Sequence, residues 1–409
     1  MLSEKYPQLQ KYRWLLFFAV LSSLVISMKL NSVCIILLGI QWLLLVHSSE
    51  KKESLRQNWK LLSIFAAYFL LFTVSILYSE NASGAWKDVE SKLSLLLIPL
   101  SILGQKKLEV KEQAILLKLY VWFLVGVGLF LVGKSLFLEG NLLTNQEFSA
   151  LIGVHASYLS LYMAVALFIA IQSIIQKSHV KLYTIIALFF ALLLVLLAAR
   201  MVLIATFLSL FTWVAVVHFT WKRLLTMIAI LIIVVVAISS VDSVKNRFQE
   251  GLVGEKVEFG TVTDSTEIKT YGGKAIRFAI WQCAQEVIEE NWLIGVGAGD
   301  VHKSLQDSYK RNEFQLAWQF NNYNSHNLFI ETIIAVGVLG IGVLISLFYL
   351  LFFYAIKSRN MLFFCFTTLF FMFSLIESAF NVQKGIVFLV AFSCLLFSAR
   401  EEVAKSKVL

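Results

Sequence analysis

The chain has 409 residues, 59% of them hydrophobic, and its mean hydropathy of +0.78 is too high for a water-soluble core inside a polar shell. The composition excludes a soluble globular domain and indicates an all-α, polytopic integral membrane protein. The formal net charge of +9 comes mostly from short connections between apolar segments, so we expect no nucleic-acid partner.

Twelve apolar segments, separated by charged and polar residues, are candidates for membrane-spanning helices. The hydrocarbon core of a bilayer is roughly 30 Å thick and takes about 20 apolar helical residues to cross. The predicted spans, in chain order, are 13–28, 30–47, 59–78, 90–104, 115–136, 154–176, 182–199, 201–219, 223–240, 327–356, 361–378 and 384–399. The sequence therefore predicts about twelve transmembrane helices.

The seventh and eighth segments form one apolar run, Leu182 to Phe219, with a single full charge, Arg200, near its middle. As one helix, at about 1.5 Å per residue, this run would be about 57 Å long, nearly twice the hydrocarbon thickness. We therefore expect the chain to fold back near Arg200, although no glycine or proline there marks the turn.

Lysines and arginines are concentrated in alternate short connections, and this asymmetry predicts the orientation of the helices. Both termini are predicted to be cytoplasmic, and the long polar loop 241–325 is predicted to lie outside. The chain then divides into a region of six N-terminal helices at 1–181, a core at 182–345 that includes the outer loop, and a region at 346–409 with the last helices and a cytoplasmic tail.

Five ionisable residues from distant parts of the sequence fall near the outer ends of their predicted spans. They are Lys92, His155, Arg200, His326 and Glu377. A charge at the centre of a transmembrane helix costs about 2.5–3.5 kcal/mol on insertion scales, so such residues usually serve a function. A polar cavity that opens outward is the simplest interpretation. The alternative is that each residue lies at the interface, where it extends toward water or pairs with a neighbour.

The outer loop contains a predicted amphipathic helix at 274–292, which we expect to lie along the membrane surface. Its apolar residues recur at helical spacing, at Ile276, Ile280, Cys283 and Val287. Arg277 falls in the first turn, where helix amides and a guanidinium group together favour a phosphate. Trp281 follows one turn later and could stack on the guanidinium or on a sugar ring. The alternative is that Arg277 is an ordinary surface arginine.

The stretch 293–300, Leu-Ile-Gly-Val-Gly-Ala-Gly-Asp, has three glycines that permit a tight turn. It does not follow a strand, so spaced glycines here do not indicate dinucleotide binding. We expect a structural turn that returns the outer loop to the membrane. Gly337 and Gly340, further along the chain, indicate close helix packing.

His326 opens the tenth predicted span, directly after the polar loop, with Asn324 or Ser325 available to cap the helix. The helix dipole at this end disfavours a protonated imidazole, and a neutral ring can accept a proton. His326 is therefore a candidate general base. The alternative is a hydrogen-bonded structural histidine at the interface.

Taken in order, these motifs resemble the O-antigen ligase and polymerase family. The resemblance rests on Arg200, the Arg277-x-x-x-Trp281 pair, the Ile-Gly-Val-Gly-x-Gly turn, His326-Asn327 and Gly337-x-x-Gly340, and it covers roughly 182–345. The regions around Lys92 and His155 also resemble members of this family. One departure is that the family commonly has Ser or Thr before the first arginine and Gly after it, whereas Arg200 lies between Ala199 and Met201.

The resemblance implies glycosyl transfer at the outer face of the bacterial cytoplasmic membrane. The donor would be a polyprenyl-diphosphate-linked glycan, and the acceptor a sugar hydroxyl on the lipid A core in a ligase, or another lipid-linked repeat in a polymerase. Arg277 and Arg200 would bind the diphosphate, and His326 would orient or deprotonate the acceptor hydroxyl. The expected substrate-binding residues are Trp281, Asn327, Lys92, His155 and Glu377. No metal or other cofactor is expected, since diphosphate is already a good leaving group.

A transporter or flippase for the same lipid-linked sugars is the rival from another class of protein. It would need polar groups through the membrane midplane and often has two repeated halves. The candidate residues here gather at one end of the spans, and the single long loop breaks any symmetry between halves. The sequence therefore favours an enzyme.

Overall fold

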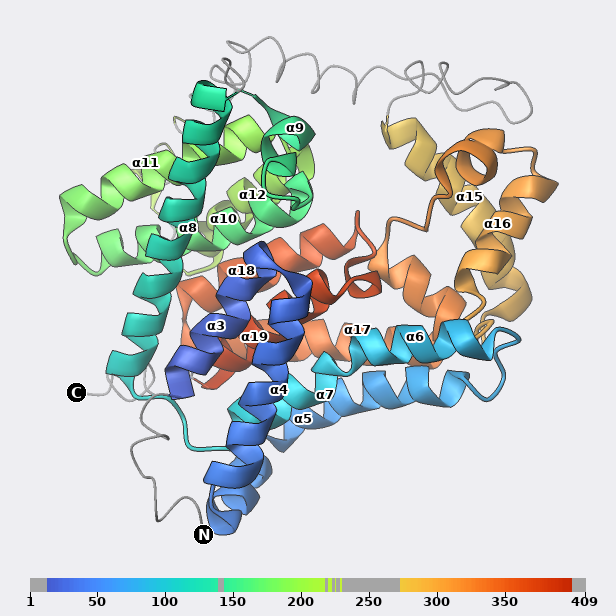
Figure 1. The fold of residues 1–409 in the computed structure, drawn as a ribbon, viewed down its shortest axis with the longest axis horizontal. Coiled ribbons are helices and arrows are strands. Elements are labelled where there is room, and N and C mark those ends of the chain that lie inside the picture. The colour runs from blue at the N-terminus through green and yellow to red at the C-terminus, as the bar shows by residue number, and fades with distance from the viewer. Residues whose placement is uncertain are drawn as a thin grey trace.

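The computed structural model describes residues 13–138, 143–217 and 273–398, with the short pieces 220–222, 225 and 229. Before residue 217 the helices are α3 (Arg13–Ile26), α4 (Met28–Leu45), α5 (Ser48–Ser75), α6 (Ala82–Lys92), α7 (Ser94–Leu103), α8 (Val110–Leu138), α9 (Asn145–Ala150), α10 (Ala156–Ile175), α11 (Val180–Leu197) and α12 (Arg200–Val217). From residue 273 they are α15 (Gly273–Asn291), α16 (Val301–Arg311), the π-helix η2 (Leu316–Asn321), α17 (Leu328–Ser358), α18 (Met361–Ser374), the 3-10 helix η3 (Ala379–Asn381) and α19 (Gln383–Ser398). The described part contains helices and no strands (Figure 1), which confirms that the fold is all-α.

Six of the described helices are long and apolar enough to cross a membrane, namely α4, α5, α8, α10, α11 and α17. The shorter apolar helices α3, α12, α18 and α19 pack against them or against one another. This composition and length are those of a polytopic membrane protein. The predicted count of twelve spans is not confirmed, because 223–240 lies almost wholly outside the described residues.

The predicted span 90–104 is divided between two helices that meet at Leu93, α6 and α7. Only α7 is apolar along its length, whereas α6 carries charged residues, and with ten residues α7 is too short to cross a bilayer alone. Both helices pack along α5, so together they form the return arm of a helical hairpin.

The apolar run around Arg200 turns where the sequence predicted. Ala198 closes α11 in the left-handed conformation, with φ of 47°, and α12 begins at Arg200. After the turn α12 packs mainly on α18, while α11 packs on α10. The left-handed conformation usually needs glycine, so the sequence offered no signal for this residue.

The predicted amphipathic helix of the outer loop is α15, and its predicted apolar residues are buried. It packs against α16 and α17, and Figure 1 shows α15 and α16 side by side, apart from the long central helix α17. The position of α15 relative to a membrane surface stays a prediction.

Helix α17 is broken at Val336 and Gly337, about a third of the way along, and the glycine-rich stretch 293–300 packs at the break. Gly337 adopts φ of 65° and ψ of −160°. The amides of Val296 and Gly297 donate to the carbonyls of Ile334 and Ala335 at 2.8 and 3.0 Å. A Cβ on Gly337 would lie 2.2 Å from the carbonyl oxygen of Leu293. The interpretation of this stretch as a structural turn is therefore confirmed. Gly337 is closely packed against the turn at Leu293, and not against another helix as the sequence predicted.

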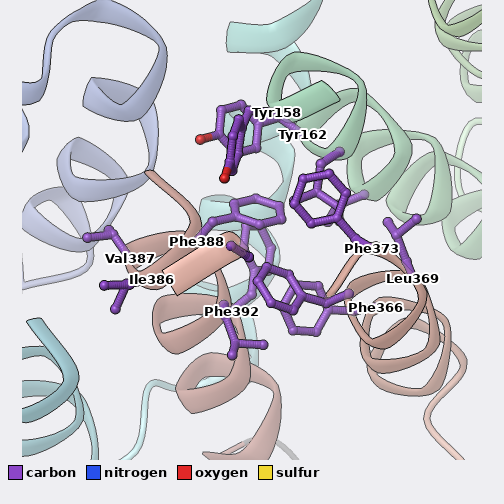
Figure 2. Packing of buried hydrophobic residues seen from close by; sticks show 14 of the residues in the cluster. Tyr158, Tyr162, Phe366, Leu369, Phe373, Ile386, Val387, Phe388 and Phe392 are labelled. Carbon is purple, nitrogen blue, oxygen red and sulfur yellow. The ribbon is translucent and has the colours of Figure 1, made fainter. Parts of the chain in front are cut away.

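An aromatic core joins α10, α18 and α19 (Figure 2). The rings of Tyr162 and Phe388 lie 4.6 Å apart, and Tyr158 meets Phe373 edge to face at 5.4 Å. Such pairs contribute about 0.5–1.5 kcal/mol each beyond their burial. This core fixes the start of α10 next to the end of α18, where His155 and Glu377 lie.

Candidate functional site

His326 lies in the short connection between η2 and α17 and adopts a left-handed backbone conformation with φ of 45°. The sequence predicted Asn324 or Ser325 as the cap of α17, and this prediction is wrong. The cap is Asn327, whose side-chain oxygen accepts from Phe329 N at 2.8 Å. Asn324 instead accepts from His326 N at 2.9 Å. The helix thus begins two residues after His326.

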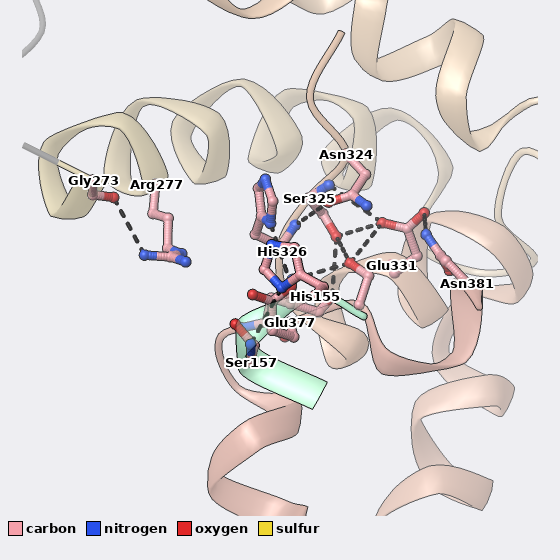
Figure 3. A network of polar contacts seen from close by, with 12 residues as sticks. His155, Ser157, Gly273, Arg277, Asn324, Ser325, His326, Glu331, Glu377 and Asn381 are labelled. Atoms are coloured by element: carbon pink, nitrogen blue, oxygen red, sulfur yellow. Dashed lines mark hydrogen bonds and ion pairs between the residues drawn. The ribbon is translucent and has the colours of Figure 1, made fainter. Parts of the chain in front are cut away.

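The imidazole of His326 faces a carboxylate from the far end of α18 (Figure 3). Its Nδ1 lies 3.6 Å from Oε2 of Glu377, which is longer than a hydrogen bond and would make an ion pair only with a protonated ring. The side chains are 27% and 19% exposed, so both can be reached by a substrate. The ring of Tyr323 packs edge to face on the imidazole, with centroids 5.6 Å apart. The structure therefore joins two predicted site residues, His326 and Glu377.

The two predicted arginines meet at Gly273, the first residue of α15. Nη2 of Arg200 and Nη1 of Arg277 each lie 3.8 Å from the position that a Cβ on Gly273 would occupy. Nη1 of Arg277 also donates to the Gly273 carbonyl at 3.5 Å, while its Nε is buried and has no hydrogen-bond partner among the described residues. The turn at Ala198 and the start of α15 thus bring together two guanidinium groups that are distant in the sequence.

Tyr323 connects the arginines to the His326 side of the site. Burial raises the pKa of its phenol, and the nearby charge of Arg277 opposes that rise. The phenol therefore remains neutral at ordinary pH and can donate a hydrogen bond. Tyr323 thus packs on His326, before α17, and is close enough to Arg277, on α15, for that charge to act on its phenol.

Trp281 has a different contact from the predicted stacking on Arg277. Its indole N–H donates to the carbonyl of Ser325 at 3.0 Å, which ties α15 to the segment that carries His326. His155 caps α10, where its Nδ1 accepts from Ser157 N at 3.3 Å, and Figure 3 shows it in the same cluster as His326 and Glu377. Contact of Trp281 or His155 with a sugar stays a prediction.

Two further predicted substrate-binding residues make structural contacts. The Lys92 side chain is buried; its Nζ lies 2.5 Å from Oδ1 of Asp88 and 4.4 Å from the ring centroid of Phe72. Asn327 donates from Nδ2 to the carbonyl of Leu375 at 3.0 Å, in addition to capping α17. The roles of Lys92 and Asn327 toward a substrate stay predictions.

The sequence did not single out Glu331, in the first turn of α17. Its carboxylate accepts hydrogen bonds from the hydroxyl of Ser325 and, at 2.7 Å, from Nδ2 of Asn381 (Figure 3). An acidic residue inside an apolar span was the available signal, and it is of the same kind that pointed to Glu377. Tyr323, in contrast, carried no signal in the sequence.

Comparison with known proteins indicates a family for part of the chain. Residues 184–345 match the family model described as O-antigen ligase, and the matched range contains Arg200, Arg277 and His326. No curated protein matches the chain. The match supports the predicted family, whose members are membrane enzymes of the ligase and polymerase type. The protein therefore carries a domain of the O-antigen ligase family.

Proposed function

We propose that the protein is an inverting glycosyltransferase that moves a glycan from a polyprenyl-diphosphate carrier to an acceptor hydroxyl, a sugar of the lipid A core. The reaction would take place at the periplasmic face of the bacterial cytoplasmic membrane. The observation that carries the proposal is the pair of guanidinium groups at Gly273, connected through Tyr323 to the His326–Glu377 pair.

The donor diphosphate binds between Arg200 and Arg277. Charge-assisted hydrogen bonds contribute about 1.5–3 kcal/mol each, and those to a leaving group strengthen as negative charge develops on it. The buried, unpaired Nε of Arg277 is one donor for this purpose, and the backbone amides at the start of α15 are others. These groups supply the positive charge that the leaving diphosphate requires, so the reaction is expected to proceed without a metal ion.

The acceptor hydroxyl binds at His326. Glu377 beside Nδ1 favours the tautomer with its proton on Nδ1, which leaves Nε2 free to take the acceptor's proton. The acceptor oxygen then attacks the anomeric carbon opposite the diphosphate. A new C–O bond forms, the bond to the phosphate oxygen breaks, and the diphosphate leaves with the electron pair. Displacement from the opposite face inverts the anomeric configuration.

A polymerase would use the same groups with another lipid-linked repeat as its acceptor. The two functions differ in the acceptor and not in the residues that perform the displacement. A lipid A core acceptor is the first choice here because the matched domain is described as an O-antigen ligase.

The test is transfer by purified protein in vesicles that contain polyprenyl-diphosphate-linked glycan and lipid A core. We expect His326→Ala to lower the transfer rate at least about 100-fold, the usual contribution of a general base. His302→Ala, an exposed histidine on α16, is the matched control and should keep the wild-type rate. The rate should also withstand EDTA. Wild-type transfer by His326→Ala, measured as glycan-modified lipid on a gel, would contradict the proposed role.

A further inference from the structure

We propose that Glu331 is a positioning residue that holds His326 and Glu377 opposite each other. The inference rests on the proposed function and adds a residue to its machinery. Glu331 touches neither member of the pair; it acts through the residues next to them in the sequence, Ser325 and Ser378.

On the histidine side, Glu331 holds the residue directly before His326. The hydroxyl of Ser325 donates to Oε2 of Glu331, and Ser325 N lies 3.4 Å from the same oxygen. Ser325 is fully buried. The carbonyl of Ser325 meanwhile accepts from Trp281. The backbone that leads into His326 is therefore held from two directions.

On the carboxylate side, Glu331 holds the segment that follows Glu377. The hydroxyl of Ser378 lies 3.4 Å from Oε2 of Glu331, and Asn381 donates to Oε1 at 2.7 Å. The hydroxyls of Ser325 and Ser378 are also 3.1 Å apart. One carboxylate on α17 thus connects the two segments that carry the histidine and its partner.

The His326–Glu377 contact needs this support for two reasons. His326 is a non-glycine residue in the left-handed region, a conformation that persists only when its surroundings hold it. The contact is also long, at 3.6 Å, and Nδ1 has no hydrogen bond of its own in the described structure. A small displacement of either segment would separate the pair, and a misplacement of about 1 Å costs roughly 100-fold in rate.

The chemistry of the cluster requires a carboxylate at residue 331. Its oxygens face the donors Ser325 O–H, Ser378 O–H and Asn381 N–H, and an ionised carboxylate only accepts hydrogen bonds. In Glu331→Gln only one acceptor oxygen would remain, so the exposed Asn381 amide would have to turn over to pair with the new NH2, and the negative charge that strengthens the serine hydrogen bonds would be lost. In Asn381→Asp two carboxylates would face each other.

The experiment exchanges the carboxylate of Glu331 and the amide of Asn381 and measures each variant in the same transfer assay. We expect Glu331→Gln to lower kcat roughly 10- to 100-fold with an unchanged KM for the donor, since the arginines are untouched. Asn381→Asp should lower kcat similarly. The double variant restores one amide opposite one carboxylate and should recover kcat to within about threefold of wild type. Glu289→Gln, an exposed carboxylate on α15, is the matched control.

The outcomes separate the inference from the proposed function. No transfer by the wild type would refute the function itself. If the wild type transfers glycan, three results would each overturn the positioning role. They are full activity of Glu331→Gln, a rise in donor KM that accounts for the loss, and no recovery in the double variant. A fall in Tm that parallels the loss of kcat across the variants would assign Glu331 to stability alone and would overturn it too.

Discussion

Arginine at residue 277 offers a diphosphate a planar fork of donors that lysine does not have. Arg277 uses Nη1 on the carbonyl of Gly273 and keeps a buried, unpaired Nε, so part of the fork remains available for a ligand. A lysine ammonium is a compact point charge with no equivalent of the fork. The geometry, and not only the charge, is therefore expected to matter at this residue.

We expect Arg277→Lys to lower the rate of glycan transfer roughly 10- to 100-fold, because it replaces charge-assisted hydrogen bonds without removing the charge. Initial rates at saturating acceptor measure the effect. Arg311→Lys is the control: Arg311 is 53% exposed on α16 and its ion pairs with Glu286 and Glu290 lie at the surface, where they contribute little. Equal rates for Arg277→Lys and wild type would leave the diphosphate without its proposed ligand.

At the scale of single residues, the sequence pointed to the groups with unusual chemistry and missed those that hold them. Arg200, His326 and Glu377 stood out because ionisable groups are rare near membrane spans, and Arg277 because it falls in the first turn of the predicted amphipathic helix. Their convergence depends on the left-handed turn at Ala198 and on tertiary contacts, which residue spacing does not encode.

The same limit explains the wrong cap. Asn324, Ser325 and Asn327 are all suitable cap residues by type. A residue in the left-handed conformation cannot lie inside an α-helix. Since His326 adopts this conformation, α17 can begin only after it, and Asn327 becomes the cap. No sequence rule anticipates a left-handed histidine at this position.

Among the helices, α17 carries the main irregularity of the fold, and the site depends on it. The part before the break follows His326 and bears Glu331, and it is held at the break by the stretch 293–300. Directly after the break, Val338 N donates to the carbonyl of Trp292 at 2.9 Å instead of to a carbonyl of α17 itself. The outer layer of α15 and α16 is thereby attached directly to the helix that positions the histidine.

Gly337→Ala should destabilise this attachment. The residue has φ and ψ that essentially only glycine adopts, at a cost of about 1–3 kcal/mol for other residues, and its Cβ would lie 2.2 Å from the Leu293 oxygen. We expect a lower Tm in detergent and a lower transfer rate.

Gly342→Ala is the matched control on the same helix, because a Cβ there meets open space. Its Tm should be unchanged or slightly higher, as expected when alanine replaces glycine inside a helix. If Gly337→Ala kept both the wild-type Tm and rate, the break would not be required for the attachment.

At the scale of whole helices, hydropathy located the apolar parts better than the ends. Helix α5 begins at Ser48, well before the predicted span 59–78. The prediction missed its first turns because they are polar and a hydropathy pattern detects only the apolar part of a helix. The same limit made 90–104 appear as one span. Helix geometry continues wherever hydrogen bonds allow it, regardless of polarity.

For the whole molecule, the proposed site and a second pocket lie at opposite ends of α10. Helix α10 has 20 residues and is therefore about 30 Å long, close to the hydrocarbon thickness. The proposed site lies at its start, near His155. The basic residue Lys118 and the end of α10 line a pocket of about 430 Å³ at the opposite end. If the helices cross the membrane, these two ends lie on opposite sides of it.

Cysteine labelling tests which side is which, and the native cysteines do not interfere. All four, Cys34, Cys283, Cys365 and Cys394, are buried. Cys283, on α15, has in addition a pKa raised to about 12, chiefly by burial, so its reactive thiolate is scarce at neutral pH. The wild-type protein should therefore resist a membrane-impermeant maleimide.

Two exposed positions at opposite ends then report the orientation. Gln282→Cys lies on α15 beside Cys283 and should be labelled in intact spheroplasts, because the predicted excess of basic residues inside places this layer outside. Lys118→Cys should be labelled only after the membrane is permeabilised. The reverse pattern would put Arg277 and His326 in the cytoplasm, where a periplasmic acceptor could not reach them, and the proposed ligase reaction would fail for reasons of topology alone.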